Sequence, residues 1–232
     1  MPDAGEPELM PHGYTHRTSR RGAAVTKAYQ GPEAAARCTR EAAALTALAG
    51  FLPVPPVLEI GPGHLVTRLM PGIHGQDLIA AGLAGQVLAA CGRMLRQIHQ
   101  LPVPGALTAV GEQGAFLVHG DFGPNNVLLD DRALAVTAVV DWEWAHAGDP
   151  VEDLAWCEFI VRLHHPAESA ALDGFYAAYG SRPPWAELQR EILGRCQEML
   201  ELCERWQAGG ESARAWAARI AIARSWAERP DD

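Results

Sequence analysis

Residues 119–144 read HGDFGPNNVLLDDRALAVTAVVDWEW, and the spacing of polar side chains in this stretch decides which fold is expected of the whole chain. Asp121 and Asn126 follow His119 in an H-x-D-x-x-x-x-N pattern, and an apolar run over 136–140 leads directly to Asp141. This is the order of a phosphoryl-transfer catalytic loop followed by a metal-binding aspartate. The stretch therefore predicts a site where a magnesium nucleotide and a hydroxyl group meet.

The residue types match what phosphoryl transfer requires of a protein, which is mainly positioning and charge neutralisation. Asp121 is the candidate catalytic base that orients the hydroxyl and accepts its proton. Asn126 and Asp141 offer the oxygen ligands that Mg²⁺ prefers. Strands over 127–129 and 135–140 would form a hairpin that brings these two ligands together. The alternative is a surface turn carrying two solvent-facing acids.

The same stretch resembles a known family. The segments HGDFGPNN and VVDWEWAHAGDPVEDLAW are similar to those of the aminoglycoside phosphotransferase and choline kinase family, whose fold is related to that of protein kinases. The resemblance implies Asp121 as the catalytic base and Asn126 and Asp141 as the metal ligands. The residues to which it gives a structural role around the loop are His119, Asp149 and Asp153.

The resemblance also predicts an α+β, protein-kinase-like bilobal fold. Residues 1–71 would form a small N-terminal nucleotide-binding lobe with an antiparallel sheet. Residues 72–232 would form a larger, mainly helical C-terminal lobe for catalysis and acceptor binding. The boundary is set at Pro71-Gly72, which interrupts the strand expected over 64–70. Apolar residues recur at helical spacing over 77–101, 185–206 and 211–228.

Lys27 is the single lysine among 19 basic residues. In a chain that otherwise uses arginine, this indicates a position that arginine would not serve. A compact ammonium on the strand expected over 23–29 would reach the α- and β-phosphates of a nucleotide. In the family a helix glutamate pairs with this lysine; Glu41, in the helix expected over 32–49, is preferred to Glu33. The alternatives are a surface lysine and a solvent-facing glutamate.

The nucleotide-binding loop lacks a strong fingerprint, because neither G-x-G-x-x-G nor G-x-x-x-x-G-K-[ST] occurs. Residues 12–19, HGYTHRTS, are the candidate phosphate-covering loop, with Thr18 and Ser19 supplying hydroxyls; a plain β-turn is the alternative. By resemblance, the backbone at Arg68 and Met70 would hydrogen-bond the purine of ATP or GTP.

Composition limits the classes of protein that fit. The net charge of −9 argues against a nucleic-acid partner and leaves a cationic substrate possible. Apolar runs are too short to span a membrane, and residues 1–10 are unlike a signal peptide, so a cytoplasmic protein without a membrane partner is expected. The five scattered cysteines form no C-x-x-C pair and are expected to be reduced core residues. The sequence does not predict an oligomeric state.

The acceptor is expected to be a small hydroxylated molecule bound by the helical lobe, with Glu143, Trp144 and Glu158 as candidate acceptor-binding residues. Acids there would attract a polyamine. Family acceptors include aminoglycosides, other antibiotics, choline, amino acids and sugars, so the fold does not choose among them. An arginine-rich, alanine-rich chain suggests a high-GC bacterium, where antibiotic self-resistance is a common use of the family. The prediction is an antibiotic O-phosphotransferase acting in resistance.

Two other functions compete with this prediction. A pseudokinase-like regulatory module would bind nucleotide without transferring phosphate, but the complete set of Asp121, Asn126 and Asp141 argues against it. A metal-dependent hydrolase would use His119, Asp121 and Asp141 in a two-metal site. Such centres recruit further histidines and carboxylates, and the other histidines show no convergent spacing.

Overall fold

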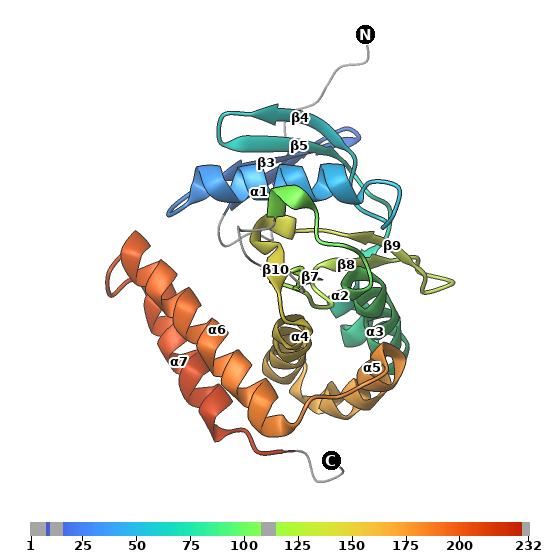
Figure 1. Cartoon of the computed structure of the whole chain (residues 1–232), viewed down its shortest axis with the longest axis vertical. Coiled ribbons are helices and arrows are strands. Elements are labelled where there is room, and N and C mark those ends of the chain that lie inside the picture. The colour runs from blue at the N-terminus through green and yellow to red at the C-terminus, as the bar shows by residue number, and fades with distance from the viewer. Residues whose placement is uncertain (1–7, 10–15, 108–114, 229–232) are drawn as a thin grey trace.

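The computed structural model describes residues 8–9, 16–107 and 115–228. They form a small lobe around an antiparallel sheet and a larger lobe of helices (Figure 1). This is the two-lobed α+β architecture predicted from the sequence. The stretch 119–144 lies in the larger lobe where it faces the smaller one.

The N-terminal lobe is a five-stranded sheet of order β1-β2-β3-β5-β4 in which every neighbouring pair is antiparallel. Helix α1 (Ala34–Leu48) packs on it and buries Leu45 and Leu48. The predicted lysine strand, the hairpin after it and the helix over 32–49 correspond to β3, β4–β5 and α1. The strands are β1 (Glu8–Leu9), β2 (His16–Arg21), β3 (Ala24–Tyr29), β4 (Val57–Gly61) and β5 (His64–Arg68).

The chain crosses between the lobes after β5. It leaves the first sheet at Arg68 and enters a second at β6 (Ile73–His74), so the boundary predicted at 71/72 falls in the crossing. Gly72 adopts a φ of 127° there, and a Cβ on it would lie 3.0 Å from the carbonyl oxygen of Leu129. Only glycine suits this backbone conformation at such a close approach.

Residues 119–144 lie on and around a second sheet, of order β6-β8-β9. Strands β8 (Val127–Leu129) and β9 (Val136–Val139) form the expected hairpin, with Val127 opposite Val139. The N–H of Val140 donates to the carbonyl of Asn126 at 2.9 Å. The residues flanking the two strands therefore meet at one end of the hairpin. A further pair, β7 (Phe116–Val118) and β10 (His146–Gly148), is antiparallel.

Helices make up the rest of the larger lobe. Residues 77–101 were predicted to form two helices, and they form the C-terminal part of α2 and all of α3. Helix α4 was not predicted, because Asp153 to Val161 are all buried and the sequence shows no polar face. The helices are α2 (Gly75–Ala80), α3 (Ala84–His99), α4 (Pro150–His164), α5 (Leu172–Tyr179), α6 (Trp185–Trp206) and α7 (Glu211–Ser225), with short 3₁₀ turns η1 (Gly105–Leu107), η2 (Trp142–Trp144) and η3 (Pro166–Ala171).

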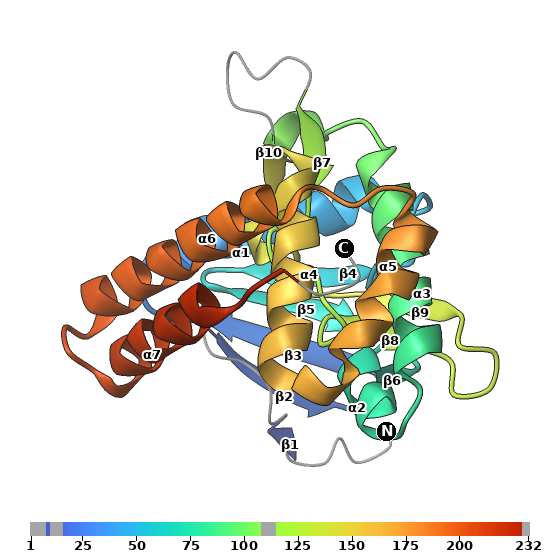
Figure 2. The same ribbon diagram turned by 90° about the horizontal axis from the view of Figure 1, so that it is seen from below.

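Helices α6 and α7 form an antiparallel hairpin alongside α4 (Figure 2). The C-terminal end of α6 reaches the small lobe, where Arg205 pairs with Glu33 at 3.2 Å. A Cβ on Gly31 would lie only 2.6 Å from the ring of Trp206, so the tryptophan packs directly on this glycine. Helix α6 thus touches both lobes. Within the described residues, no helix combines the length and apolar character needed to cross a bilayer.

Candidate active site

Lys27 is the centre of a buried charge cluster between the lobes. Its Nζ lies 2.6 Å from Oε2 of Glu41 and 2.6 Å from Oδ1 of Asp141. The hydroxyl of Tyr29 donates to the same oxygen of Glu41. Burial alone would lower the pKa of Lys27, but the charges of Asp141 and Glu41 raise it above its ordinary value, so the ammonium stays protonated. Strand β3, helix α1 and the catalytic segment therefore meet at one cation.

Glu33, the alternative to Glu41 as the partner of Lys27, pairs with another residue. It is exposed and pairs with Arg205. Glu41 is the helix glutamate that contacts Lys27.

Asp141 stands in a left-handed conformation, with φ of 66° and ψ of 52°, which aspartate tolerates better than most residues. η2 begins after this residue, and the side chain of Glu143 within it lies against α1. There its Oε2 accepts a hydrogen bond from Nη1 of Arg37 at 2.6 Å, and Arg40 donates to its carbonyl at 3.1 Å. The side chains of Arg37 and Glu143 are 1% and 5% exposed. Glu143 therefore joins α1 to the Asp141 turn, and the expectation that it binds the acceptor is wrong.

Glu158, also expected in the acceptor site, is corrected in the same way. Its side chain on α4 is fully buried, accepts a hydrogen bond from Tyr176 at 2.5 Å and pairs with Arg162 at 2.8 Å. The carboxylate is therefore an internal partner of Tyr176 and Arg162 and is not exposed at the surface of the lobe.

Asp121 is held from two sides. Its Oδ1 accepts a hydrogen bond from Nε1 of Trp156 at 2.6 Å, and its Oδ2 accepts one from Nδ2 of Asn126 at 2.8 Å. Burial, together with the charge of Asp141, raises the pKa of Asp121 to about 7, although the two hydrogen bonds and the charge of Arg195 act in the opposite direction. A carboxylate with a pKa near the operating pH is suited to accepting a proton.

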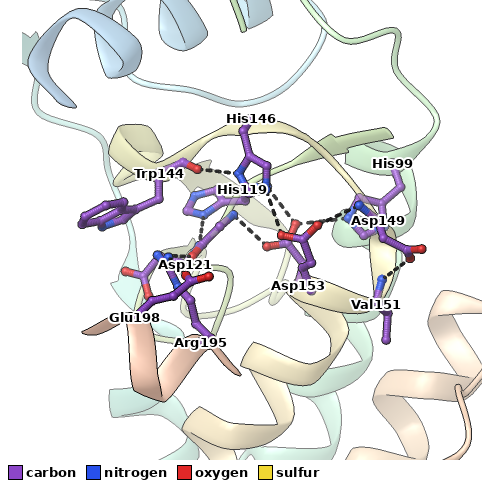
Figure 3. Close-up of polar contacts among 12 residues, drawn as sticks. His99, His119, Asp121, Trp144, His146, Asp149, Val151, Asp153, Arg195 and Glu198 are labelled. Carbon is purple, nitrogen blue, oxygen red and sulfur yellow. Dashed lines mark hydrogen bonds and ion pairs between the residues drawn. The ribbon is translucent and has the colours of Figure 1, made fainter. Parts of the chain in front are cut away.

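A buried aspartate on α4 fixes the loop around Asp121 (Figure 3). Asp153 accepts hydrogen bonds from the backbone N–H groups of His119 at 2.8 Å and Gly120 at 2.9 Å, and from His99 at 3.1 Å. Burial alone would raise the pKa of Asp153, but these partners hold it below its ordinary value. The carboxylate is therefore charged and organises the loop, as the sequence led us to expect.

His119 is fully buried and bridges the loop to Val140, the residue that follows β9. Its Nε2 lies 2.9 Å from the carbonyl of Val140, and its Nδ1 accepts the N–H of Asp121 at 3.2 Å. Burial lowers its pKa, so the imidazole is neutral. Gly120 beside it has a φ of 80°, and a Cβ there would lie 2.5 Å from the carbonyl oxygen of Trp144.

Asp149 caps the N-terminus of α4. Its side chain accepts the N–H of Val151 at 3.0 Å, while Glu152 accepts the N–H of Asp149 at 2.8 Å, which completes a capping box. The other carboxylate oxygen of Glu152, Oε2, lies 2.8 Å from Nε2 of His146. This cap sets where α4 begins, and hence where Asp153 and Trp156 lie.

Arg195, on α6, approaches Asp121 from the side opposite the small lobe. Its Nη2 donates to the carbonyl of Gly120 at 3.2 Å, and its guanidinium lies 4.9 Å from the ring centre of Trp144 and 5.8 Å from that of Trp156. Figure 3 shows Arg195 beside Asp121, with Trp144 adjoining. Trp144, a predicted acceptor-binding residue, thus lies against Arg195.

The residues predicted to bind the nucleotide differ in position. Thr18 lies opposite Lys27 in the β2–β3 ladder, and directly paired residues of antiparallel strands share a face. Ser19 is next in the strand and therefore points to the other face. Of the two predicted hydroxyls, only that of Thr18 is on the face of Lys27. Residues 12–15 of the predicted phosphate loop lie outside the described residues.

The predicted purine contacts lie where β5 ends. The N–H of Arg68 donates to the carbonyl of Pro56 at 2.9 Å and is therefore already occupied. Met70 is half-buried and follows the strand just beyond its last residue.

The side chains present fit a magnesium ion shared with a nucleotide. Among the described residues, no cluster of three or more His, Cys, Asp or Glu side chains could form a metal cage. Asn126 donates through Nδ2 to both the carbonyl and the carboxylate of Asp121, which leaves its Oδ1 as a ligand atom. Mg²⁺ is typically held by one or two protein oxygens plus phosphates and water. A divalent cation would also offset the excess of carboxylates around Lys27.

Comparison with known proteins agrees with this geometry. A model of the phosphotransferase enzyme family matches residues 8–117 and 106–191. The chain belongs to this family. The resemblance found in residues 119–156 is thereby confirmed, and the match extends it through the small lobe to the start of α6.

Solved structures show the same fold. The GDP complex of wild-type aminoglycoside 2'-phosphotransferase-IIIa superimposes with a TM-score of 0.75 at 14% identity, covering 97% of this chain and 94% of that one. The macrolide 2'-phosphotransferase MphH of Brachybacterium faecium gives a TM-score of 0.65 at 20% identity, covering 98% and 95%. The predicted protein-kinase-like bilobal fold is confirmed.

Curated relatives match over short segments. Acyl-CoA dehydrogenase family member 11 of Pongo abelii is 31% identical over 91 residues, which are 39% of this chain and 11% of that protein. The uncharacterized protein YcbJ of Bacillus subtilis (strain 168) is 34% identical over 76 residues, 33% of this chain and 23% of that protein. The chain thus matches less than a quarter of the length of either relative.

Several residues of the site were not found from the sequence. Tyr29 donates to Glu41, and Arg37 donates to Glu143. Trp156 donates to Asp121, and Arg195 donates to the carbonyl of Gly120. Trp156 stands inside the quoted segment VVDWEWAHAGDPVEDLAW, and its indole N–H was the available signal. Arg37 and Arg195 lie among eighteen arginines, and nothing in their local sequence distinguishes them.

Proposed function

We propose that this protein is a small-molecule O-phosphotransferase that moves the γ-phosphoryl group of ATP or GTP to a substrate hydroxyl. The observation that carries the proposal is the meeting of Lys27, Asp141 and Asp121 at the junction of the lobes, with Asn126 bonded to Asp121. A cation for the phosphates, oxygen ligands for a metal and a base for the hydroxyl are the components that phosphoryl transfer needs.

The nucleotide would bind in the small lobe. Lys27 is oriented by Glu41 and carries the positive charge that the α- and β-phosphates require. Thr18 shares its face of the sheet, while the carbonyl of Arg68 and the backbone of Met70 are the proposed purine contacts. A solved relative is described as a GDP complex and another as ADP-bound, which supports either purine donor.

Asp121 would act on the acceptor. The hydrogen bonds from Trp156 and Asn126 fix the carboxylate plane, so that it can orient the attacking hydroxyl and take its proton. Asn126 and Asp141 would hold Mg²⁺, which supplies charge neutralisation for the phosphates. His119, Asp149 and Asp153 keep these groups in place through the contacts described above.

An antibiotic remains the proposed kind of acceptor, with a role in resistance inside the cytoplasm. The solved relatives include one described as a GDP and kanamycin complex and one named a macrolide phosphotransferase. The burial of Glu143 and Glu158 removes two of the acids expected to attract a polyamine. This favours a hydroxylated natural product that is not a polycation.

The test is to mix the protein with ATP or GTP, Mg²⁺ and a library of hydroxylated compounds, and to detect a mass gain of one phosphoryl group. Asp121→Asn should keep nucleotide binding and lose roughly 10²–10⁴-fold in transfer rate. Asp131→Asn, in the exposed turn after β8, is the matched control and should keep the full rate. Unchanged turnover in Asp121→Asn would refute the base, and nucleotide binding without transfer to any acceptor would favour the pseudokinase-like module.

A further inference from the structure

The guanidinium of Arg195 lies beside the proposed base, Asp121 (Figure 3). It reaches the carbonyl of Gly120, the residue before Asp121, with Nη2 at 3.2 Å. Its charge is close enough to act on the pKa of Asp121. A group that binds Arg195 would therefore lie within a few bonds of a hydroxyl presented to Asp121.

Arg195 retains donor capacity for a ligand. Its Nη1 pairs with Glu198 at 2.9 Å, and that carboxylate side chain is 65% exposed. Exposed ion pairs of this kind contribute little to stability, so a ligand anion can replace Glu198. The Nε atom is buried and has no hydrogen-bond partner among the described residues, so a ligand would bind the terminal nitrogens Nη1 and Nη2. A planar guanidinium with free donors is the preferred side chain for binding a carboxylate or phosphate with two hydrogen bonds.

Aromatic rings fix the direction of this guanidinium. Trp144 lies 4.9 Å and Trp156 5.8 Å from it, both at distances of favourable cation–π contact. Trp216 of α7 stacks on Trp156 with ring centres 6.0 Å apart, so the ring of Trp156 is itself held in place. Because Arg195 is already oriented, a ligand would bind it with little loss of side-chain freedom.

Besides Glu198 and Asp121, three further acids of this region are already engaged by other residues. Glu143 is committed to Arg37 and Glu158 to Arg162, both in buried pairs. Glu152 pairs with His146 and caps α4. A cationic acceptor would therefore meet the arginine rather than these carboxylates.

We propose that Arg195 selects an acceptor that carries an anionic group, a carboxylate or phosphate, close to the hydroxyl that is phosphorylated, with the half-buried indole of Trp144 packing against its apolar part. This inference rests on the proposed phosphotransferase function and names the chemistry of its acceptor. Arg195 is a specificity-determining residue of the same site.

The test uses acceptors that differ only in charge. 4-(Hydroxymethyl)benzoate, its methyl ester and 4-(hydroxymethyl)benzylamine share a ring and a primary alcohol, and they head a library of hydroxylated compounds sorted by net charge. With ATP or GTP and Mg²⁺, the wild-type protein should show a kcat/KM for anionic members at least about tenfold above their neutral partners, since each tenfold corresponds to about 1.4 kcal/mol. Hydrolysis of the nucleotide by water is measured in parallel.

Variants then assign the preference to one side chain. Arg195→Gln should raise KM for anionic acceptors until they match the neutral ones, and Arg195→Glu should turn the preference toward the amines. Because the charge of Arg195 also acts on Asp121, the measured quantity in both variants is the ratio of kcat/KM for anionic to neutral acceptors, and not the absolute rate. Arg190→Gln is the matched control, because Arg190 is on the same helix, 66% exposed and paired only with surface glutamates. It should retain the wild-type preference.

Three outcomes separate the possibilities. If the wild type phosphorylates only neutral or cationic members, the inference is overturned and the phosphotransferase function stands. If Arg195→Gln lowers hydrolysis and every transfer by the same factor, Arg195 contacts the transferred phosphoryl group and does not select the acceptor. If neither transfer nor magnesium-dependent hydrolysis occurs with either nucleotide, the proposed function itself fails.

Discussion

The buried pair between Arg37 and Glu143 offers the sharpest test of how the site is held together. It joins α1, which carries Glu41, to the turn that carries Asp141. We predict that Glu143→Ala destabilises the fold and weakens nucleotide binding together. Removing Glu143 takes away a carboxylate that lies 2.6 Å from Nη1 of Arg37, whose side chain is only 1% exposed.

The magnitude follows from that burial. Loss of one partner of a buried ion pair costs about 3–5 kcal/mol, because the remaining charge stays desolvated. Arg37 would keep its bonds to the carbonyls of Gln30, at 2.5 Å, and Pro32, at 3.3 Å, so the lower half of that range is expected. With a urea dependence of about 3 kcal/mol per molar, the unfolding midpoint should fall by roughly 1 M. Glu143→Gln keeps an acceptor and should lose less.

The assay is urea unfolding followed by tryptophan fluorescence, in a double-mutant cycle of Glu143→Ala, Arg37→Met and both changes together. The double variant should be more stable than the sum of the single losses by at least about 1 kcal/mol, because it leaves no unpaired charge. Nucleotide affinity is measured on each variant that folds. A Glu143→Ala midpoint equal to wild type, or strictly additive losses, would show that the pair does not couple α1 to the Asp141 turn.

Three further predictions concern single residues. Lys27→Met should raise the KM for ATP or GTP by about tenfold or more while the protein stays folded, because a charge-assisted contact with phosphate is lost; an unchanged KM in steady-state kinetics would contradict this. Gly120→Ala should lower stability by about 1–3 kcal/mol in thermal unfolding, since its φ is 80° and its Cβ would meet the carbonyl oxygen of Trp144; a wild-type melting temperature would show that the loop can relax. Because the pKa of Asp153 is depressed in the fold, its contribution to stability is present above the ordinary carboxyl pKa of about 3.9 and is lost as the pH falls through the folded value. Urea unfolding at a series of acidic pH values should show this loss in wild type and a flatter profile in Asp153→Asn; equal slopes would refute the role of Asp153.

Local patterns in the sequence were sufficient for much of the fold. The spacing of Asp121, Asn126 and Asp141 around two short apolar runs predicted the hairpin, since backbone pairing over a short loop is a local property. The helical spacing over 185–206 predicted α6 to its first and last residues. Helix α4 was missed because it is buried on nearly every side and so has no polar face to reveal its period.

The sequence by itself determined the family and which residues meet at the end of the β8–β9 hairpin, because those residues are close along the chain and their spacing is constrained by backbone geometry. Tertiary structure decided which acids are buried in ion pairs. Arg37 and Glu143 are 106 residues apart, and Arg195 and Gly120 are 75 apart. Contacts over such separations depend on how whole helices pack, and burial sets whether a carboxylate serves as a ligand or as an internal partner. That is why Glu143 and Glu158 could not be assigned from sequence, and why Arg195 emerged only from the position of α6.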